Sequence, residues 1–162
     1  MNGYLLDTNA VCKWFQNHAN VVAHVNALPG NLPLVISAVT LGEIECGHYR
    51  SAGTNPSRRK SFEVWVSQTF PFPLPITRHT SSIYGQLKAS IFNRHPPPRK
   101  SRQVENCYDK VSGRELGIDE NDLWIAAQAI EHKLVLVTND RMRHILDGAG
   151  NTLLREDWEL PI

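Results

Sequence analysis

The chain has 162 residues, of which 41% are hydrophobic and 20% are charged. These proportions indicate one globular domain with a buried core, and they exclude collagen, coiled coils and wholesale disorder. No apolar run approaches the roughly 18 residues that a membrane span requires, and no basic cluster precedes the first apolar stretch, so we expect a cytoplasmic protein without membrane contact. The three cysteines, Cys12, Cys46 and Cys107, form no C-x-x-C pair and indicate reduced thiols, two of them (Cys12 and Cys46) in the core.

The charges are sorted along the chain, although the formal net charge is only +1. Residues 50–102 contain ten Lys and Arg side chains and one acid, Glu63, whereas residues 103–162 carry six basic and twelve acidic side chains. Such sorting indicates a surface that binds a polyanion. A simpler alternative is that these lysines and arginines only solvate the faces of helices.

Hydrophobic periodicity predicts short strands that alternate with helices. In chain order, we expect a strand at 4–6, a helix at 8–17, a strand at 34–36, helices at 37–49, 57–69, 77–92 and 119–133, a strand at 134–138, a short helix at 139–146 and an extended piece near 152–154. The proline-rich stretch 71–77 fits an extended connector. Strands separated by helices favour an α/β fold with a parallel, helix-covered sheet.

Residues 95–117 differ from the rest of the chain. Three consecutive prolines at 96–98 favour a polyproline-like start, and the remainder is polar with few apolar anchors. We expect a long, exposed, basic loop inserted into a single domain that spans 1–162.

Four acids are predicted at one edge of the sheet. Asp7 directly follows the first strand, and Asp140 lies two residues after LVLVT. Glu43 lies two turns into the helix after the second strand, and Asp122 lies in the first turn of the helix before LVLVT. Ligands of open parallel sheets bind beyond the carboxyl ends of the strands. Two like charges 4 Å apart cost about 4 kcal/mol at an effective dielectric constant near 20, so cations are expected, and all-oxygen ligands favour Mg²⁺ or Mn²⁺.

Each acid also has a plain structural explanation, as a helix cap, a turn residue or a solvated helix acid. Their shared location on four separate elements favours the metal-site hypothesis. Asp119 is an alternative to Asp122, because three residues separate them on one helix face; we prefer Asp122, which LWIAA follows directly. His48, His132 and His144 fall where helix surfaces are expected, and no histidine has the spacing of a general base paired with a nucleophile.

Four sequence blocks carry a family resemblance. LLDTN at 5–9, S-x-x-T-x-x-E-x-x-x-G from Ser37 to Gly47, NDLWIAAQA at 121–129 and LVLVTND at 134–140 resemble PIN-domain nucleases, and more closely the VapC-type toxins of bacterial toxin–antitoxin pairs. The resemblance covers nearly the whole chain and implies a three-layer α/β/α fold with a short central parallel sheet. It assigns metal binding and catalysis to Asp7, Glu43, Asp122 and Asp140, with Thr8, Asn9, Ser37, Thr40 and Thr138 as supporting polar residues.

The resemblance implies a Mg²⁺- or Mn²⁺-dependent endoribonuclease that cleaves structured RNA, transfer or ribosomal, by metal-activated water. It also implies a homodimer and a cognate antitoxin that covers the groove. The 95–117 segment departs from the family pattern, because it is longer and more basic than the usual connector. The RNA-binding candidates are Arg58, Arg59, Lys60, Arg99, Lys100, Arg102 and Arg141.

Two other functions fit parts of the sequence. A PIN-like nuclease of RNA processing, or one directed at DNA, would keep the acids without a toxin role. A doubly wound signalling or binding module, such as a phospho-accepting receiver, needs an acidic pair near the first strand, where this chain has Asp7 alone.

Overall fold

The structure is a computed structural model that describes residues 2–50, 55–98, 101–109 and 111–162. Four short strands form one parallel sheet in the order β2-β1-β3-β4. They are β1 (Tyr4–Leu6), β2 (Leu34–Ile36), β3 (Val135–Val137) and β4 (Leu154–Glu156). Because all four strands run the same way, their carboxyl ends lie along one edge of the sheet.

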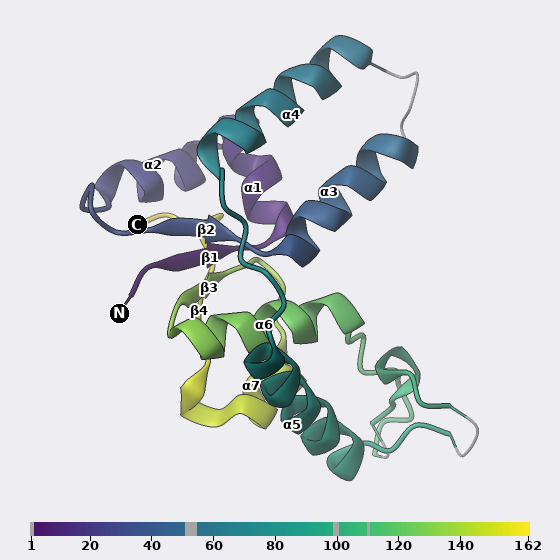
Figure 1. The fold of residues 1–162 in the computed structure, drawn as a ribbon. Helices are drawn as coiled ribbons and strands as arrows, with labels where there is room; N and C mark the ends of the chain where they lie inside the picture. Colours follow the sequence, from purple (N-terminus) through teal and green to yellow (C-terminus); the bar gives the residue numbers. More distant parts are fainter. Residues whose placement is uncertain (1, 51–54, 99–100, 110) are drawn as a thin grey trace.

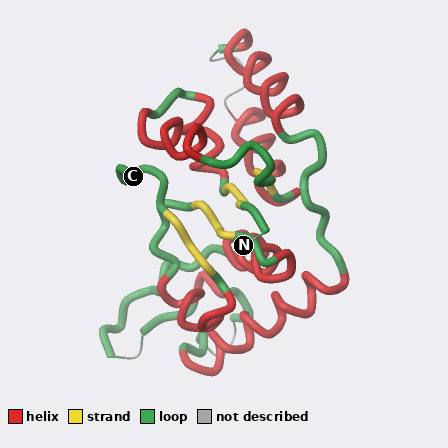
Figure 2. Tube along the Cα trace, turned by 90° about the vertical axis from the view of Figure 1, so that its left-hand side faces the viewer, coloured by secondary structure: helices red, strands yellow, loops and turns green. Residues whose placement is uncertain are grey.

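Helices cover both faces of this sheet (Figures 1 and 2). On one face lie α1 (Thr8–Phe15), α2 (Ala19–Ala27), α3 (Ala38–Arg50) and α4 (Pro56–Thr69). On the other lie α5 (Arg78–Arg94), α6 (Glu120–His132) and α7 (Arg143–Ala149), with short 3₁₀ turns at Val104–Asn106 and Gly150–Thr152. The expected three-layer α/β/α fold is confirmed.

The alternation of side chains along the strands divides the core into two clusters. Tyr4 and Leu6 of β1 pack with α1–α4, whereas Leu5 packs with α5, α6 and α7. Leu5 and Leu6 are both fully buried, which explains why β1 is an uninterrupted apolar run. A sheet buried on both faces leaves its strand ends as the accessible edge.

Most predicted helices are found within a few residues of their expected bounds, but α2 was not predicted. Its sequence, ANVVAHVNA, buries Val21 alone, and its N-cap residue, His18, makes no side-chain capping hydrogen bond. The last strand lies at Leu154–Glu156 rather than near 152–154. None of the helices that the structure describes is both long and apolar enough to cross a membrane.

The 95–117 segment is anchored more firmly than its composition predicts. Val104 and Cys107 are fully buried and belong to the core cluster beneath α5 and α6. A short antiparallel bridge joins Tyr108 to Glu115, and the Asp109 backbone N–H donates to the Arg114 carbonyl at 2.8 Å. Most of the described residues of this segment are exposed, as expected, and Val104 and Cys107 are its two buried anchors.

Three side-chain expectations are also corrected. Cys46 is exposed and Cys12 only half-buried, so neither is a core thiol. His48 is buried rather than on a helix surface, since it packs edge-on against Phe62 of α4, with 5.3 Å between ring centroids. The packing of α4 on α3 covers this position.

Candidate active site

Asp7 is fixed at the carboxyl end of β1. Its backbone N–H donates to the Val137 carbonyl of β3 at 3.1 Å, and its Oδ1 accepts from the Ala10 N–H at 2.6 Å, which caps α1. The side chain is only 6% exposed. This carboxylate is therefore held at the point where two adjacent strands end.

Glu43 reaches the same edge from α3. Its Oε1 accepts a hydrogen bond from Asn121 Nδ2 at 2.8 Å, and its Oε2 accepts one from Thr8 Oγ1. Residues on α1 and α6 therefore orient this carboxylate between them.

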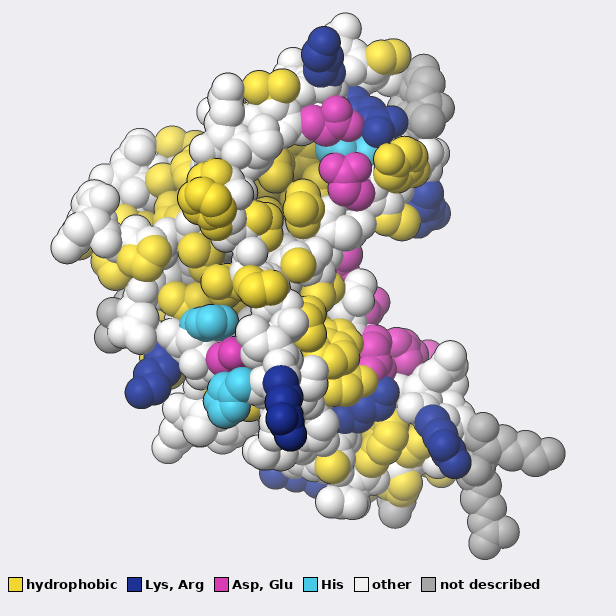
Figure 3. Space-filling view, viewed as in Figure 1, with side chains coloured by type: hydrophobic (Ala, Val, Ile, Leu, Met, Phe, Trp, Pro, Cys, Tyr) yellow, Lys and Arg dark blue, Asp and Glu magenta, His cyan; other side chains and the backbone are white. Residues whose placement is uncertain are grey.

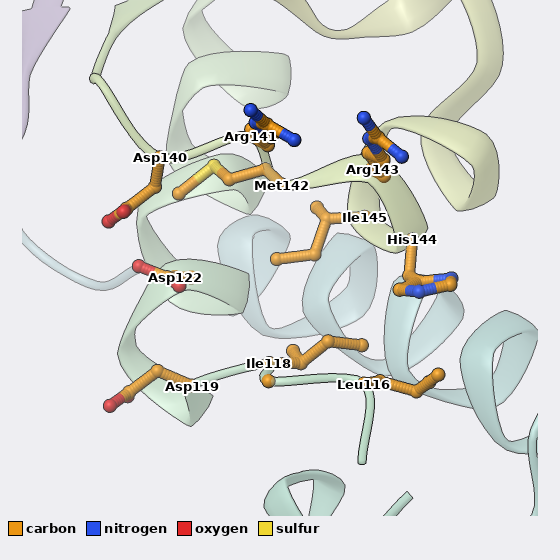
Figure 4. Close-up of a pocket in the computed structure, with 11 residues that line it drawn as sticks. Leu116, Ile118, Asp119, Asp122, Asp140, Arg141, Met142, Arg143, His144 and Ile145 are labelled. Carbon is orange, nitrogen blue, oxygen red and sulfur yellow. The ribbon is translucent and has the colours of Figure 1, made fainter. Parts of the chain in front are cut away.

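The remaining acids come from α6 and from the turn after β3. Asp119 caps α6 by accepting from the Asn121 N–H at 2.8 Å, and Asp122 lies in the first turn of that helix. The Asp140 backbone N–H donates to Thr138 Oγ1 at 3.1 Å. Figure 4 shows the oxygens of all three aspartates on the same side.

These elements together line one cavity of about 340 Å³. It contains all four of the acids singled out in the sequence and also Asp119. Figure 3 shows acidic side chains in the indented right-hand edge of the molecule. The residues around the cavity are Asp7, Thr8, Asn9, Glu43, Asp119, Asp122, Ile125 and Asp140.

Burial, together with neighbouring negative charge, raises the proton affinity of two of these acids. The pKa of Asp7 is raised to about 6, first by burial and then by the charges of Asp140 and Glu43, while hydrogen bonds from Thr138 and Ala10 oppose the rise. Burial, and then the nearby carboxylates of Asp140 and others, raises the pKa of Asp122 to about 7. Both shifts reflect burial first, and then the negative charge of the neighbouring carboxylates.

The donor set fits a hard divalent cation. All of the ligand atoms that the acids offer are carboxylate oxygens, the ligands that Mg²⁺ and Mn²⁺ prefer. The pKa values of Asp7 and Asp122 are raised, and a bound positive ion would lower them, because it stabilises the charged carboxylates.

The predicted supporting residues divide into three kinds. Thr8 and Thr138 contact the acids directly, the latter through the Asp7 side chain and the Asp140 N–H. Asn9 lines the cavity and donates to Asn139 Oδ1 at 3.2 Å. Ser37 begins α3 by accepting from the Val39 N–H at 2.9 Å, and Thr40 is fully buried outside the cavity lining.

Sequence reasoning missed two contributors. Asn121 orients Glu43, and Ile125 supplies an apolar wall of the cavity. Asn121 belongs to the ND pair that opens the third sequence block, so the motif contains it. That its side chain points toward Glu43 of α3 depends on how α6 packs against α3, which the motif does not specify.

A second group of ligand-type side chains lies on the outer side of α3. Atoms of Glu45, His48 and Glu63 all lie within 4.8 Å of one another. Glu63 Oε1 also accepts from Arg59 Nε at 2.7 Å and lies 3.6 Å from His48 Nδ1. The Arg59 guanidinium therefore balances part of the negative charge of this group.

The candidate RNA-binding residues are spread over two regions. Arg58 and Lys60 are exposed at the start of α4, at the end of the α3–α4 pair farthest from the sheet, and Arg59 is held by Glu63 (Figure 1). Arg102 is exposed, and Arg141 lines a second pocket beside the acids. Arg99 and Lys100 lie outside the described residues.

Comparisons with known proteins show the family and the fold of this chain. Ribonuclease VapC4 of Mycobacterium tuberculosis is 27% identical over 105 residues, a match that spans 65% of this chain and 65% of that relative. VapBC-1 of nontypeable Haemophilus influenzae has a similar fold, with a TM-score of 0.67 and 25% identity over 97% of this chain and 98% of that chain. For DNA-bound VapBC of Salmonella typhimurium the TM-score is 0.70, with 21% identity over 98% of this chain and 99% of that chain. The PIN domain family model matches residues 4–147, and the chain therefore belongs to the PIN domain family.

Proposed function

We propose that this protein is a divalent-metal-dependent endoribonuclease and the toxin of a toxin–antitoxin pair. The observation that carries the proposal is the convergence of Asp7, Glu43, Asp122 and Asp140 on one cavity at the carboxyl ends of the strands. The PIN family match and the relative named ribonuclease VapC4 support nuclease chemistry. The similar solved structures, which are VapBC assemblies, support a toxin role.

In this proposal the four acids hold Mg²⁺ or Mn²⁺. The chemistry that such an ion supplies is activation of water for in-line attack and neutralisation of charge on the phosphate. Thr8 and Asn121 keep Glu43 pointed into the cavity through its two oxygens. Thr138 positions Asp7 and the Asp140 backbone together. Because water is the attacking group, no serine, cysteine or histidine nucleophile is required.

The proposed substrate is structured RNA, transfer or ribosomal. The basic residues of the α4 start and of the 95–117 segment would hold its backbone, which makes binding weaken as salt rises. The proposed protein partners are a second copy of the chain and a cognate antitoxin that covers the acidic cavity. The similar solved structures, which are VapBC assemblies, support the antitoxin partner.

Asp7→Asn is the direct test of the metal-site proposal. The substitution removes one negative charge from a buried position while it keeps an acceptor for the Ala10 N–H, so the variant should fold. We expect RNA cleavage in Mg²⁺ or Mn²⁺ to be abolished while thermal melting remains cooperative. Asp147→Asn, an exposed aspartate on α7, is the matched control and should cleave like the wild type.

Two outcomes would contradict the proposal. One is full cleavage by a folded Asp7→Asn variant. The other is a wild-type protein that cleaves no RNA with either metal, after purification away from any bound antitoxin.

A further inference from the structure

A second pocket, of about 390 Å³, opens directly beside the acidic cavity. The two share Asp119, Asp122 and Asp140 as a common wall. The rest of the pocket is built by two segments far apart in the sequence, 116–118 and 141–145 (Figure 4). The first spans the end of the 95–117 segment and Ile118, and the second runs from the turn after β3 into the first residues of α7.

The floor of this pocket is apolar. Ile118 is 6% exposed and Ile145 is 1% exposed, and both belong to the core cluster. Leu116 and Met142 are half-buried and extend the same surface. Figure 4 shows Ile145 in the middle of the pocket, with Met142 between it and Asp140.

The rim of the pocket formed by residues 141–144 carries positive charge. Arg141 and Arg143 are exposed, and His144 lies beside Arg143 (Figure 4). In the part of the chain that the structure describes, neither arginine forms an ion pair with a carboxylate. Their guanidinium groups are therefore available to an anion, and the planar guanidinium suits phosphate oxygens.

The backbone between the two arginines has an uncommon conformation. Met142 has φ 44° and ψ 29°, a left-handed conformation that is uncommon for a residue with a side chain. Met142 lies between the two arginines, and its left-handed backbone turns the chain sharply between β3 and α7. The turn brings the Met142 side chain to the apolar floor and leaves both arginines at the rim.

From these features we propose that the pocket binds one nucleotide of single-stranded RNA, next to the phosphate that is cut. The base lies on the apolar floor made by Ile118, Met142 and Ile145, and the adjoining phosphate contacts Arg141 and Arg143. A volume of about 390 Å³ falls within the usual size range of small-molecule sites, about 300–1,000 Å³. This inference rests on the proposed ribonuclease function and adds a place where the enzyme distinguishes its substrate.

A nucleotide explains the lining better than a protein side chain does. A basic segment of a partner protein would be drawn to the acids but repelled by two unpaired arginines, whereas an apolar segment would leave both arginines without a partner. A nucleotide offers an apolar face to the floor and a negative phosphate to the rim at once.

Binding of mononucleotides, followed through methyl resonances of the full-length protein, tests the proposal without catalysis. The probes are AMP, GMP, CMP and UMP, with ribose 5-phosphate as the probe that lacks a base. We expect at least one nucleotide to bind in the millimolar range and to shift the methyl signals of Ile118, Met142 and Ile145. Ribose 5-phosphate should bind at least about fivefold more weakly, because it gains nothing from the apolar floor.

Variants separate the two halves of the site. Met142→Ala should reduce the preference for a nucleotide over ribose 5-phosphate, and Arg141→Gln combined with Arg143→Gln should weaken both probes by about tenfold. Arg78→Gln is the control, because Arg78 is exposed at the end of α5 that lies beside Glu131, at the other end of α6 from the acids. This control should bind all probes like the wild type.

Several results would overturn the inference. These are equal binding of ribose 5-phosphate and the nucleotides, shifts confined to other methyl groups, and no shift with any nucleotide. Shifts of these methyl groups on adding the antitoxin, with none on adding nucleotides, would assign the pocket to the protein partner and overturn it too. If the wild type cleaves RNA while these probes fail, only the nucleotide pocket is wrong; if Asp7→Asn cleaves normally, the proposed function itself is wrong.

Discussion

Helix α3 carries two glutamates that belong to two different groups of charges. Glu43 and Glu45 are two residues apart, so their side chains leave the helix on different faces. Glu43 lines the acidic cavity with four aspartates. Glu45 turns toward α4, where its carboxylate lies close to His48 and Glu63.

The two groups differ in the positive charge beside them. Glu63 accepts a hydrogen bond from Arg59 at 2.7 Å, and His48 lies 3.6 Å away. Among the described residues, no Lys or Arg forms an ion pair with any of the five carboxylates of the cavity. A cluster of carboxylates that is partly balanced has less need of an added ion, whereas an unbalanced cluster stabilises the fold only when it is protonated or binds a cation.

The largest expected difference between the two groups is in activity. Glu43→Gln removes a proposed metal ligand and should lower the rate of RNA cleavage at least about 100-fold. Glu45→Gln, on the same helix, should keep the rate within about twofold of the wild type, because it lies outside the cavity. Cleavage rates measured side by side on one RNA check this, and equal losses in both variants would mean that Glu43 has no special role.

Stability in the presence of metal is the next difference. A ligand that binds the folded state at a hundredfold excess over its dissociation constant adds about 2.7 kcal/mol, which is several degrees in melting temperature. We expect Mg²⁺ or Mn²⁺ to raise the melting temperature of the wild type and of Glu63→Gln alike. Glu43→Gln should gain much less. Thermal melts across a metal titration measure this, and equal gains in all three proteins would exclude Glu43 as a ligand.

The metal-free protein should lose stability as pH rises. The pKa of Asp7 is raised to about 6 and that of Asp122 to about 7, both from 3.8. Because the folded-state values lie above the unfolded ones, the protonated carboxyls stabilise the fold fully below about pH 4, and this contribution is lost as pH rises through 6 and 7. The loss should amount to a few kcal/mol at most, since solvent partly screens Asp122.

Melting temperatures of the metal-free protein between about pH 5 and about pH 8 check the sign of this effect. Asp122→Asn should flatten the pH profile, because an amide does not titrate, while Asp147→Asn should keep the wild-type slope. A decline that is just as steep in Asp122→Asn would mean that other groups, such as the histidines, cause it.

The sequence was sufficient to predict the parts of this site that depend on the sheet. Asp7 and Asp140 follow apolar strand runs, and parallel strands bring their carboxyl ends to one edge, so the meeting of these two acids follows from pattern alone. Glu43 and Asp122 needed one further step, the assumption that their helices begin at the same edge.

The sequence did not predict two features. One depends on how two helices pack against each other, and the other on a few buried apolar residues within a polar segment. Glu45 and His48 are three apart on α3, but their contact with Glu63 depends on how α4 packs, which no local pattern encodes. Val104 and Cys107 are two apolar residues in a polar stretch, and only the surrounding core shows that they are anchors.

The smallest expected effect tests whether Arg59 is what makes the outer group differ from the cavity. Its hydrogen bond to Glu63 raises the pKa of Arg59, and its guanidinium lies 5.1 Å from the Tyr49 ring centroid. Because this pair is only partly buried and lies within one helix, Arg59→Gln should change the melting temperature by no more than about 2 °C without metal. Without Arg59, the ligand atoms of Glu45, His48 and Glu63 still lie within 4.8 Å of one another, but the group loses the positive charge of the guanidinium. Mn²⁺ or Zn²⁺ should therefore stabilise the variant slightly more than the wild type.

Combining Arg59→Gln with Glu63→Gln removes one of the three ligands and should cancel that extra gain. A metal response identical in Arg59→Gln and the wild type would mean that charge balance is not what separates the two groups.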